Sequence, residues 1–187
     1  QTLNRSLIPQ LAQNGLKLVR HYEDLTPKQA KYVDKYFEKD VYPVLTPMAV
    51  DSSRPFPLVR NKSLNIGALI YDKKKDVTDI ATVQVPSVLP RIVKLPSEEK
   101  DVTEIILLEE VIEKNLDKLF LSYDIVCAYP YRIMRNADFS IYEEETADLL
   151  KEIEKQLKQR QWGEVIRLEV DEAMDKKLLK ELKNHLG

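Results

Sequence analysis

The chain has 187 residues, 43% of them hydrophobic, which is enough for one domain with a sizeable core and no disulfide or structural metal. Its 29 basic and 31 acidic residues give a net charge of −2 and are spread along the sequence, so we expect no nucleic-acid partner. No apolar stretch approaches the roughly 20 residues that span a bilayer and no signal-peptide pattern opens the chain, so we expect a cytoplasmic protein without a membrane span.

Apolar residues recur at helical spacing in residues 3–14, and Asn14-Gly15 is typical of a helix end. Because the chain begins at Gln1 and stops at Gly187 directly after a helix-like run, we expect a piece of a longer protein. Residues 1–14 would then be the tail of a preceding helical domain or a linker, and residues 15–187 would form the domain itself.

A second helix is predicted to begin at Thr26, because Thr26 and Gln29 have the spacing of a capping box and a proline occupies the first helical position. Pro43 should end this helix, since proline disfavours helical geometry in the residue before it. Residues 43–61 hold four of the ten prolines and predict an extended connector that is neither a helix nor a central strand. The inward stripe of the helix is expected to contain Ala30, Val33, Phe37 and Val41.

Alternating apolar and polar residues predict a hairpin formed by residues 64–70 and 81–85. Residues 124–135 form a long strand candidate, in which Pro130 indicates an edge position, a bulge or a division into two strands. Cys127 lies in the same apolar run, and we interpret it as a buried, unreactive thiol. The remaining patterns predict strands at 91–95, 104–108 and 164–170 and helices at 109–119, 143–160 and 173–186.

These elements predict an α+β fold, with helices packed on a mixed, largely antiparallel sheet. In the strand at 164–170 we expect Ile166, Leu168 and Val170 to face inward. The predicted core includes Leu64, Ile66, Ile70, Val83, Ile153, Leu157, Ile166 and Leu168.

Few residues in the sequence suit catalysis. Only His21 and His185 offer imidazoles, they lie near opposite ends of the chain, and no His, Cys and Asp cluster has metal-ligand spacing. The four glycines form no phosphate-binding loop. The run Glu143-Glu144-Glu145 suits the first turn of a helix, where the helix dipole favours acids. We therefore predict no catalytic residue, metal site or cofactor in this chain.

Four arginines are candidates for binding a polyanion, because guanidinium groups hold phosphate oxygens through forked, charge-assisted hydrogen bonds. Arg54 and Arg60 lie on the proline-rich connector around Phe56, which either meets a polyanion or packs over the sheet. Arg132 and Arg135 end the strand at 124–135. Residues three apart point to opposite faces of a regular strand, so these two form one clamp only if Pro130 or the strand end twists the chain.

Residues 32–66 resemble the opening of the head domain in long-chain polyphosphate kinases: a helix bearing Tyr-Phe, the PVLTP turn, then AVD, PFP and N-SLN. Asn136 stands where that family commonly has Asp. Further landmarks resemble the family in the same order: Pro90-Arg91-Ile92-Val93, Ile106-Leu107-Leu108-Glu109, Ala128-Tyr129-Pro130-Tyr131-Arg132, Arg135-Asn136-Ala137-Asp138 and Val165-Ile166-Arg167-Leu168-Glu169-Val170.

The resemblance covers nearly the whole chain and implies a parent enzyme that moves the terminal phosphate of ATP onto polyphosphate, through a phosphohistidine and with magnesium. In the family, the residues for that chemistry lie in other domains, so we expect the isolated chain to be inactive and to hold neither ATP nor magnesium. The head domain is associated with dimer contacts and with a wall of the polyphosphate tunnel. This implies the other domains of the parent and a second copy as partners, and Arg54, Arg60, Arg132 and Arg135 as polyphosphate contacts.

A function from a different class also stays open. The chain would then be a free-standing adaptor domain that binds protein partners through a sheet edge or an apolar patch. A reading frame that continues past Gly187 would favour the polyphosphate kinase fragment over the adaptor.

Overall fold

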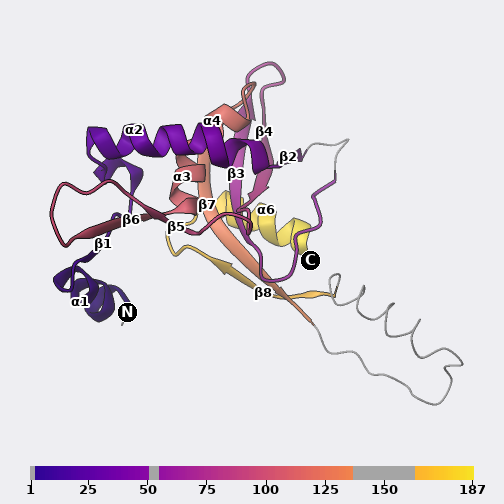
Figure 1. The fold of residues 1–187 in the computed structure, drawn as a ribbon. Coiled ribbons are helices and arrows are strands. Elements are labelled where there is room, and N and C mark those ends of the chain that lie inside the picture. The colour runs from indigo at the N-terminus through magenta and orange to yellow at the C-terminus, as the bar shows by residue number, and fades with distance from the viewer. Residues whose placement is uncertain (1–2, 51–54, 137–162) are drawn as a thin grey trace, which may run out of the picture. The chain divides into compact units, whose positions relative to one another are not determined.

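The structure of this protein is a computed structural model, which describes residues 3–50, 55–136 and 163–187. The chain forms two compact units, each made from two separate stretches of sequence (Figure 1). Unit 1 contains residues 1–47 and 85–124, and unit 2 contains residues 48–84 and 125–187. No helix in the described part of the chain is long and apolar enough to cross a membrane.

Unit 1 carries a three-stranded sheet of order β1-β6-β5, in which β1 pairs parallel and β5 antiparallel with the central β6. Its strands are β1 (Leu16–Leu18), β5 (Ile92–Lys94) and β6 (Thr103–Leu107). Its α-helices are α1 (Ile8–Gln13), α2 (Pro27–Tyr36), α3 (Leu108–Lys114) and α4 (Leu116–Leu119). Short π- and 3₁₀-helical turns complete it: η1 (Leu3–Leu7), η2 (Tyr22–Asp24), η3 (Phe37–Val41) and η4 (Tyr42–Val44).

Helix α2 begins with the predicted capping box. The Thr26 hydroxyl accepts from the Gln29 amide at 3.3 Å, and the Gln29 side chain accepts from the Thr26 amide at 3.1 Å. Regular α-geometry ends at Tyr36, and the chain continues through η3 into η4, which contains Pro43. Pro43 is accommodated because the first turn of a helix needs no amide donor. The predicted inward stripe is confirmed at three fully buried positions, Val33, Phe37 and Val41.

Unit 2 carries a five-stranded sheet of order β2-β4-β3-β7-β8, with antiparallel β3–β4 and β7–β8 pairs. Its strands are β2 (Pro47–Val50), β3 (Leu64–Asp72), β4 (Val77–Gln84), β7 (Asp124–Arg135) and β8 (Val165–Val170). Helix α6 (Lys176–Leu186) packs on β3 (Figure 1). It begins where the Asp175 carboxylate accepts from the amides of Lys177 and Leu178, at 2.8 and 3.1 Å.

The core of unit 2 lies between the sheet and α6. It consists of Val50, Val59, Leu69, Ile80, Tyr131, Ile133, Met174, Leu178 and Leu182. Tyr131 is 1% exposed, and its hydroxyl meets its buried polar partner Thr82 at 2.9 Å. Phe56 packs against this core and stacks on His185, with ring centroids 5.1 Å apart. At Phe56, therefore, the connector packs over the sheet, which is one of the two roles considered for it.

The predicted α+β fold, with mixed and largely antiparallel strands, is confirmed, although the strands divide between two sheets. The predicted hairpin corresponds to β3–β4, and the other predicted strands to β5, β6, β7 and β8. The connector at 43–61 contains β2, which is an edge strand and not a central one. β7 runs unbroken through Pro130, and β8 pairs with it only from Tyr131 onward, so Pro130 lies at an edge position. The helix predicted at 143–160 lies outside the described residues.

The prediction for the core is right in part. Ile66, Ile70 and Val83 are fully buried, and Leu64 and Leu168 are half-buried. Ile153 and Leu157 lie outside the described residues.

The inward position predicted for Ile166 is wrong, because this side chain is 63% exposed. Met134 pairs with Arg167 and Arg135 with Val165, so Ile166 has no partner in the ladder. This β-bulge adds one residue to β8 and interrupts the alternation from which the inward position was predicted. Val170 at the other end of β8 is also exposed, at 36%.

We predict that Ile166→Ala changes the free energy of unfolding by less than about 0.5 kcal/mol, since the side chain already lies in solvent. Ile133→Ala, made in the partner strand at a fully buried position, should lower it by about 2–5 kcal/mol. Urea unfolding of the two variants measures both values. An equal loss for the two variants would contradict the bulged register.

Candidate functional site

The end of β7 holds Arg135 in a fixed position. Its guanidinium donates from Nε and Nη2 to the carbonyl oxygen of Val59, both at 3.1 Å, and from Nη1 to that of Gly163 at 2.8 Å. Its backbone amide donates to the Asn61 side chain at 3.0 Å. One residue therefore joins the connector, the end of β7 and the segment that leads into β8.

The charge of Arg135 is only partly compensated. Burial lowers the pKa of its guanidinium from the ordinary value, but an arginine side chain stays protonated at neutral pH. Its described partners are carbonyl oxygens, which carry no full charge. Of the five guanidinium N–H groups, the described residues use three.

Two further cations lie beside the end of β7, on the turn that precedes β3. The Ser63 hydroxyl donates to the Arg60 carbonyl at 2.8 Å, and the Lys62 amide donates to the Ile133 carbonyl at 2.9 Å. Lys62 has a φ of +61°, a left-handed conformation that these hydrogen bonds stabilise. The structure thus brings Arg60, Lys62 and Arg135 to one end of the sheet, and we call these three residues the β7-end cluster.

Arg132 lies on the opposite face of the sheet. Its neighbours Tyr131 and Ile133 face the core, so Arg132 points away from it. The Glu169 carboxylate, across the ladder, accepts from Arg132 Nε at 2.7 Å and lies 2.6 Å from its Nη2. Arg132 and Arg135 therefore do not form one clamp. Arg54, the fourth predicted arginine, lies outside the described residues.

The sequence analysis did not select Lys62. Lys62 carried only a weak signal in the sequence, since it simply follows the two polar residues Arg60 and Asn61 at the end of the connector. What makes it a candidate is the hydrogen bond of its backbone to Ile133, a contact between distant parts of the chain that no local pattern reveals.

Neither histidine lies in described surroundings that would activate its imidazole as a nucleophile. The His21 side chain is 68% exposed, and its Nδ1 lies 3.7 Å from a Glu110 carboxylate oxygen. His185 stacks on Phe56. Among the described residues, no group of three His, Cys, Asp or Glu side chains is arranged to hold a metal ion. Cys127 is half-buried, and burial raises the pKa of its thiol, which disfavours the reactive thiolate.

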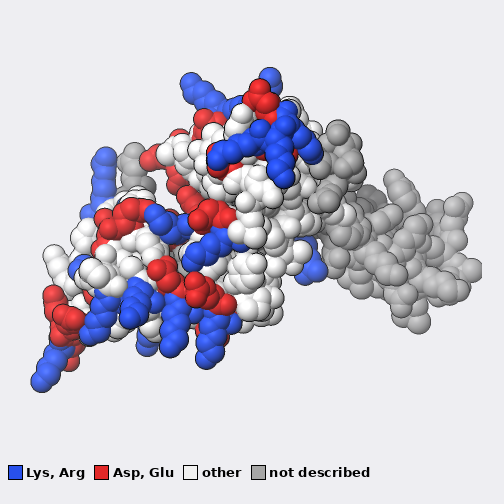
Figure 2. All heavy atoms as spheres, turned by 90° about the horizontal axis from the view of Figure 1, so that it is seen from above, with Lys and Arg blue, Asp and Glu red and all other residues white. Residues whose placement is uncertain are grey.

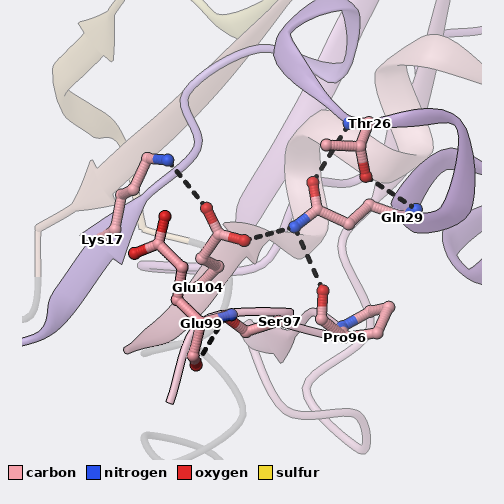
Figure 3. A network of polar contacts seen from close by, with 7 residues as sticks. All are labelled: Lys17, Thr26, Gln29, Pro96, Ser97, Glu99 and Glu104. Carbon is pink, nitrogen blue, oxygen red and sulfur yellow. Dashed lines mark hydrogen bonds and ion pairs between the residues drawn. The ribbon is translucent and has the colours of Figure 1, made fainter. Parts of the chain in front are cut away.

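A polar network in unit 1 joins α2 to β1 and β6 (Figure 3). The Gln29 amide donates to a Glu104 carboxylate oxygen at 2.5 Å and to the Pro96 carbonyl at 3.2 Å. The Lys17 ammonium lies 2.8 Å from the other Glu104 oxygen, and its hydrogen bond holds the pKa of Glu104 below the usual range. Clefts of about 370 and 470 Å³ lie against this network. Because Gln29, Lys17 and Glu104 are already paired, we assign the network to the stability of unit 1.

Both signs of charge are mixed over the face shown in Figure 2. Its Lys and Arg side chains are interspersed with Asp and Glu. The electrostatic character of unit 2 therefore depends on local groups such as the β7-end cluster, and not on a field of one sign over that face.

Known proteins resemble the chain over nearly its whole length. The family model described as the polyphosphate kinase middle domain matches residues 28–187. A polyphosphate kinase from Halalkalibacterium halodurans is 47% identical over 177 residues, which cover 94% of this chain and 25% of the relative. One from Lactiplantibacillus plantarum is 47% identical over 188 residues, which cover 100% of this chain and 26% of the relative.

A solved structure shares the fold. The crystal structure of polyphosphate kinase from Porphyromonas gingivalis matches with a TM-score of 0.74 over 96% of this chain and 25% of that one, at 22% identity. At this identity the match shows the fold alone. The chain thus spans about a quarter of the length of the relatives that it matches.

Proposed function

Because the chain belongs to the polyphosphate kinase middle-domain family, we propose that it is the non-catalytic head domain of a larger ATP:polyphosphate phosphotransferase. The parent makes inorganic polyphosphate from ATP through a phosphohistidine, with ATP and magnesium bound by its other domains. It acts in the cytoplasm, where ATP is available, and cell fractionation of the source organism would check this location. Residues 15–187 form the head domain, and residues 1–14 are the tail of the preceding helical domain or a linker.

The head domain contributes by geometry. Phosphoryl transfer needs the nucleotide, metal and acceptor held in line, so a domain that positions its neighbours or guides the polymer supports the reaction without reacting itself. The observation that carries this role is the β7-end cluster, in which the described partners of the Arg135 guanidinium are two neutral carbonyl oxygens that use three of its five N–H groups. In the proposal this cluster lines one wall of the polyphosphate tunnel.

We predict that the chain binds polyphosphate weakly and with strong salt dependence, since cations near a polyanion release counterions. The double variant Arg60→Gln, Lys62→Asn should flatten the slope of log affinity against log salt by about 1 for each cation removed. Asn is chosen at position 62 because it tolerates the left-handed backbone. Isothermal titration with tripolyphosphate at several salt concentrations measures the slope.

Arg132→Gln is the matched control, because Arg132 is paired with Glu169 on the other face of the sheet. Its affinity should stay close to that of the unchanged chain. If Arg132→Gln lost as much affinity as the double variant, we would instead place the binding surface on the face of the sheet that carries Arg132. Arg54 stays a predicted contact, and Arg54→Gln in the same titration tests it.

The isolated chain is predicted neither to make polyphosphate nor to become phosphorylated with ATP and magnesium. A histidine nucleophile must lie in line with the γ-phosphate beside cations that neutralise the developing charge. The described surroundings of His21 and His185 provide a carboxylate and a phenyl ring instead. Incubation with γ-labelled ATP, followed by alkaline gel analysis that preserves phosphohistidine, tests this. Stoichiometric label on either histidine would overturn the non-catalytic role.

Self-association is also part of the proposed function. β8 pairs only with Tyr131–Arg135, so within the described residues no strand covers that edge of the preceding part of β7, where Val126 is 58% exposed. An open strand edge with an exposed apolar side chain suits pairing with a second copy. We expect light scattering to show a concentration-dependent dimer, which Val126→Lys weakens. A monomer at every concentration would exclude the dimer contact for this chain.

A further inference from the structure

The outer face of α6 carries a row of lysines that the proposed function does not use. Leu178 and Leu182 turn the opposite face of the helix into the core of unit 2, where both are fully buried. Helical residues three or four positions apart lie on one face, so three exposed lysines line up on the side turned away from that core. We call them the α6 lysine row: Lys176, Lys180 and Lys183.

The acids nearest to this row in the sequence are directed elsewhere. The Asp175 carboxylate accepts from the amides of Lys177 and Leu178 at the start of the helix. Glu181 is half-buried and lines a cleft of about 320 Å³ beside β4. In the ranges that the structure describes, no carboxylate forms an ion pair with a lysine of the row. The row therefore offers three ammonium groups along about 10 Å of helix.

The C-terminal end of α6 contacts the connector that leads to the β7-end cluster (Figure 1). Near the end of the row, His185 stacks on Phe56 of the connector, with ring centroids 5.1 Å apart. Val59, three residues further along the connector, lies in the same core as the buried face of α6, and its carbonyl accepts from the Arg135 guanidinium. One core thus fixes both the lysine row and the β7-end cluster.

The two groups of cations are close enough for one polymer to reach both. Phe56 and Arg60 are four residues apart, which an extended chain spans in at most about 14 Å. With the length of the row along α6, the whole path is no longer than about 25 Å. Because Phe56 and Val59 pack in the core that also holds α6, this spacing is set by packed side chains and not by a flexible linker.

We propose that the α6 lysine row continues the polyphosphate contact that begins at the β7-end cluster, so that the domain holds long chains more tightly than short ones. This inference rests on the proposed function, which supplies the first contact. Ammonium groups meet phosphate oxygens as point charges, so they suit a polymer that passes without one fixed orientation. A chain that bridges both groups makes its second contact within one complex, which raises the affinity. A short oligomer reaches only one group and gains nothing from the other.

The test is a titration of the isotopically labelled chain with tripolyphosphate and with polyphosphates of increasing, defined length, followed by nuclear magnetic resonance through the Nε–H signal of Arg135. The affinity per phosphate unit should rise at least about tenfold once the polymer spans the path. In the triple variant Lys176→Gln, Lys180→Gln, Lys183→Gln this gain should disappear, whereas the affinity of tripolyphosphate at Arg135 should stay unchanged. Gln keeps the helix propensity of Lys, and an unchanged thermal unfolding curve shows that the variant is folded.

The matched control is the triple variant Lys31→Gln, Lys35→Gln, Lys39→Gln, which makes the same change of charge at exposed positions of unit 1. It should keep the preference for long chains. Equal losses in the two triple variants would overturn the inference, because they would trace the preference to net charge. Binding at Arg135 without any gain from length would overturn the inference alone. An Arg135 signal that does not respond to tripolyphosphate would instead remove the first contact, and with it the proposed role of the β7-end cluster.

Discussion

The candidate site of unit 2 depends on the hydrogen bonds of one guanidinium. Arg135 is half-buried, and even partial burial of a charge is unfavourable unless polar groups replace the lost water. Arg135 meets this requirement with the carbonyl oxygens of Val59 and Gly163, which come from the connector and from the segment before β8. These partners therefore fix where both segments lie at the end of β7. Neither of these two partners is an acid.

The register of β7 and β8 determines which charges are available. Arg132 and Arg135 lie on opposite faces of the sheet. Glu169 pairs with Arg132 but not with Arg135. Unit 1 has its charged groups already paired in the same way as Arg132. The central carboxylate of its polar network, Glu104, is bound by Lys17 and Gln29. A domain that guides a polyanion needs cations without acidic partners, and among the described residues the β7-end cluster fits that need better than the paired groups.

Local patterns were sufficient to predict most of the described elements of this fold, but not the strands β1 and β2. The capping box at Thr26, the β3–β4 hairpin and the buried stripe of α2 each follow from residues a few positions apart, so the sequence alone revealed them. The exposure of Ile166 and the selection of Lys62 could not be predicted in this way. The first depends on a bulge and the second on a hydrogen bond to Ile133, and both are set by contacts between strands distant in the chain. The family could be identified because its landmarks survive in order along the chain.

The most direct test of the central claim is to follow arginine side chains by nuclear magnetic resonance while tripolyphosphate is added to the isotopically labelled chain. The Nε–H group of Arg135, which donates to Val59, should give a resolved signal that moves saturably with the ligand. The corresponding signal of Arg132, which donates to Glu169, should stay in place. A shift confined to Arg132, or an Arg135 signal that does not respond, would contradict the assignment of the phosphate-binding surface to the end of β7.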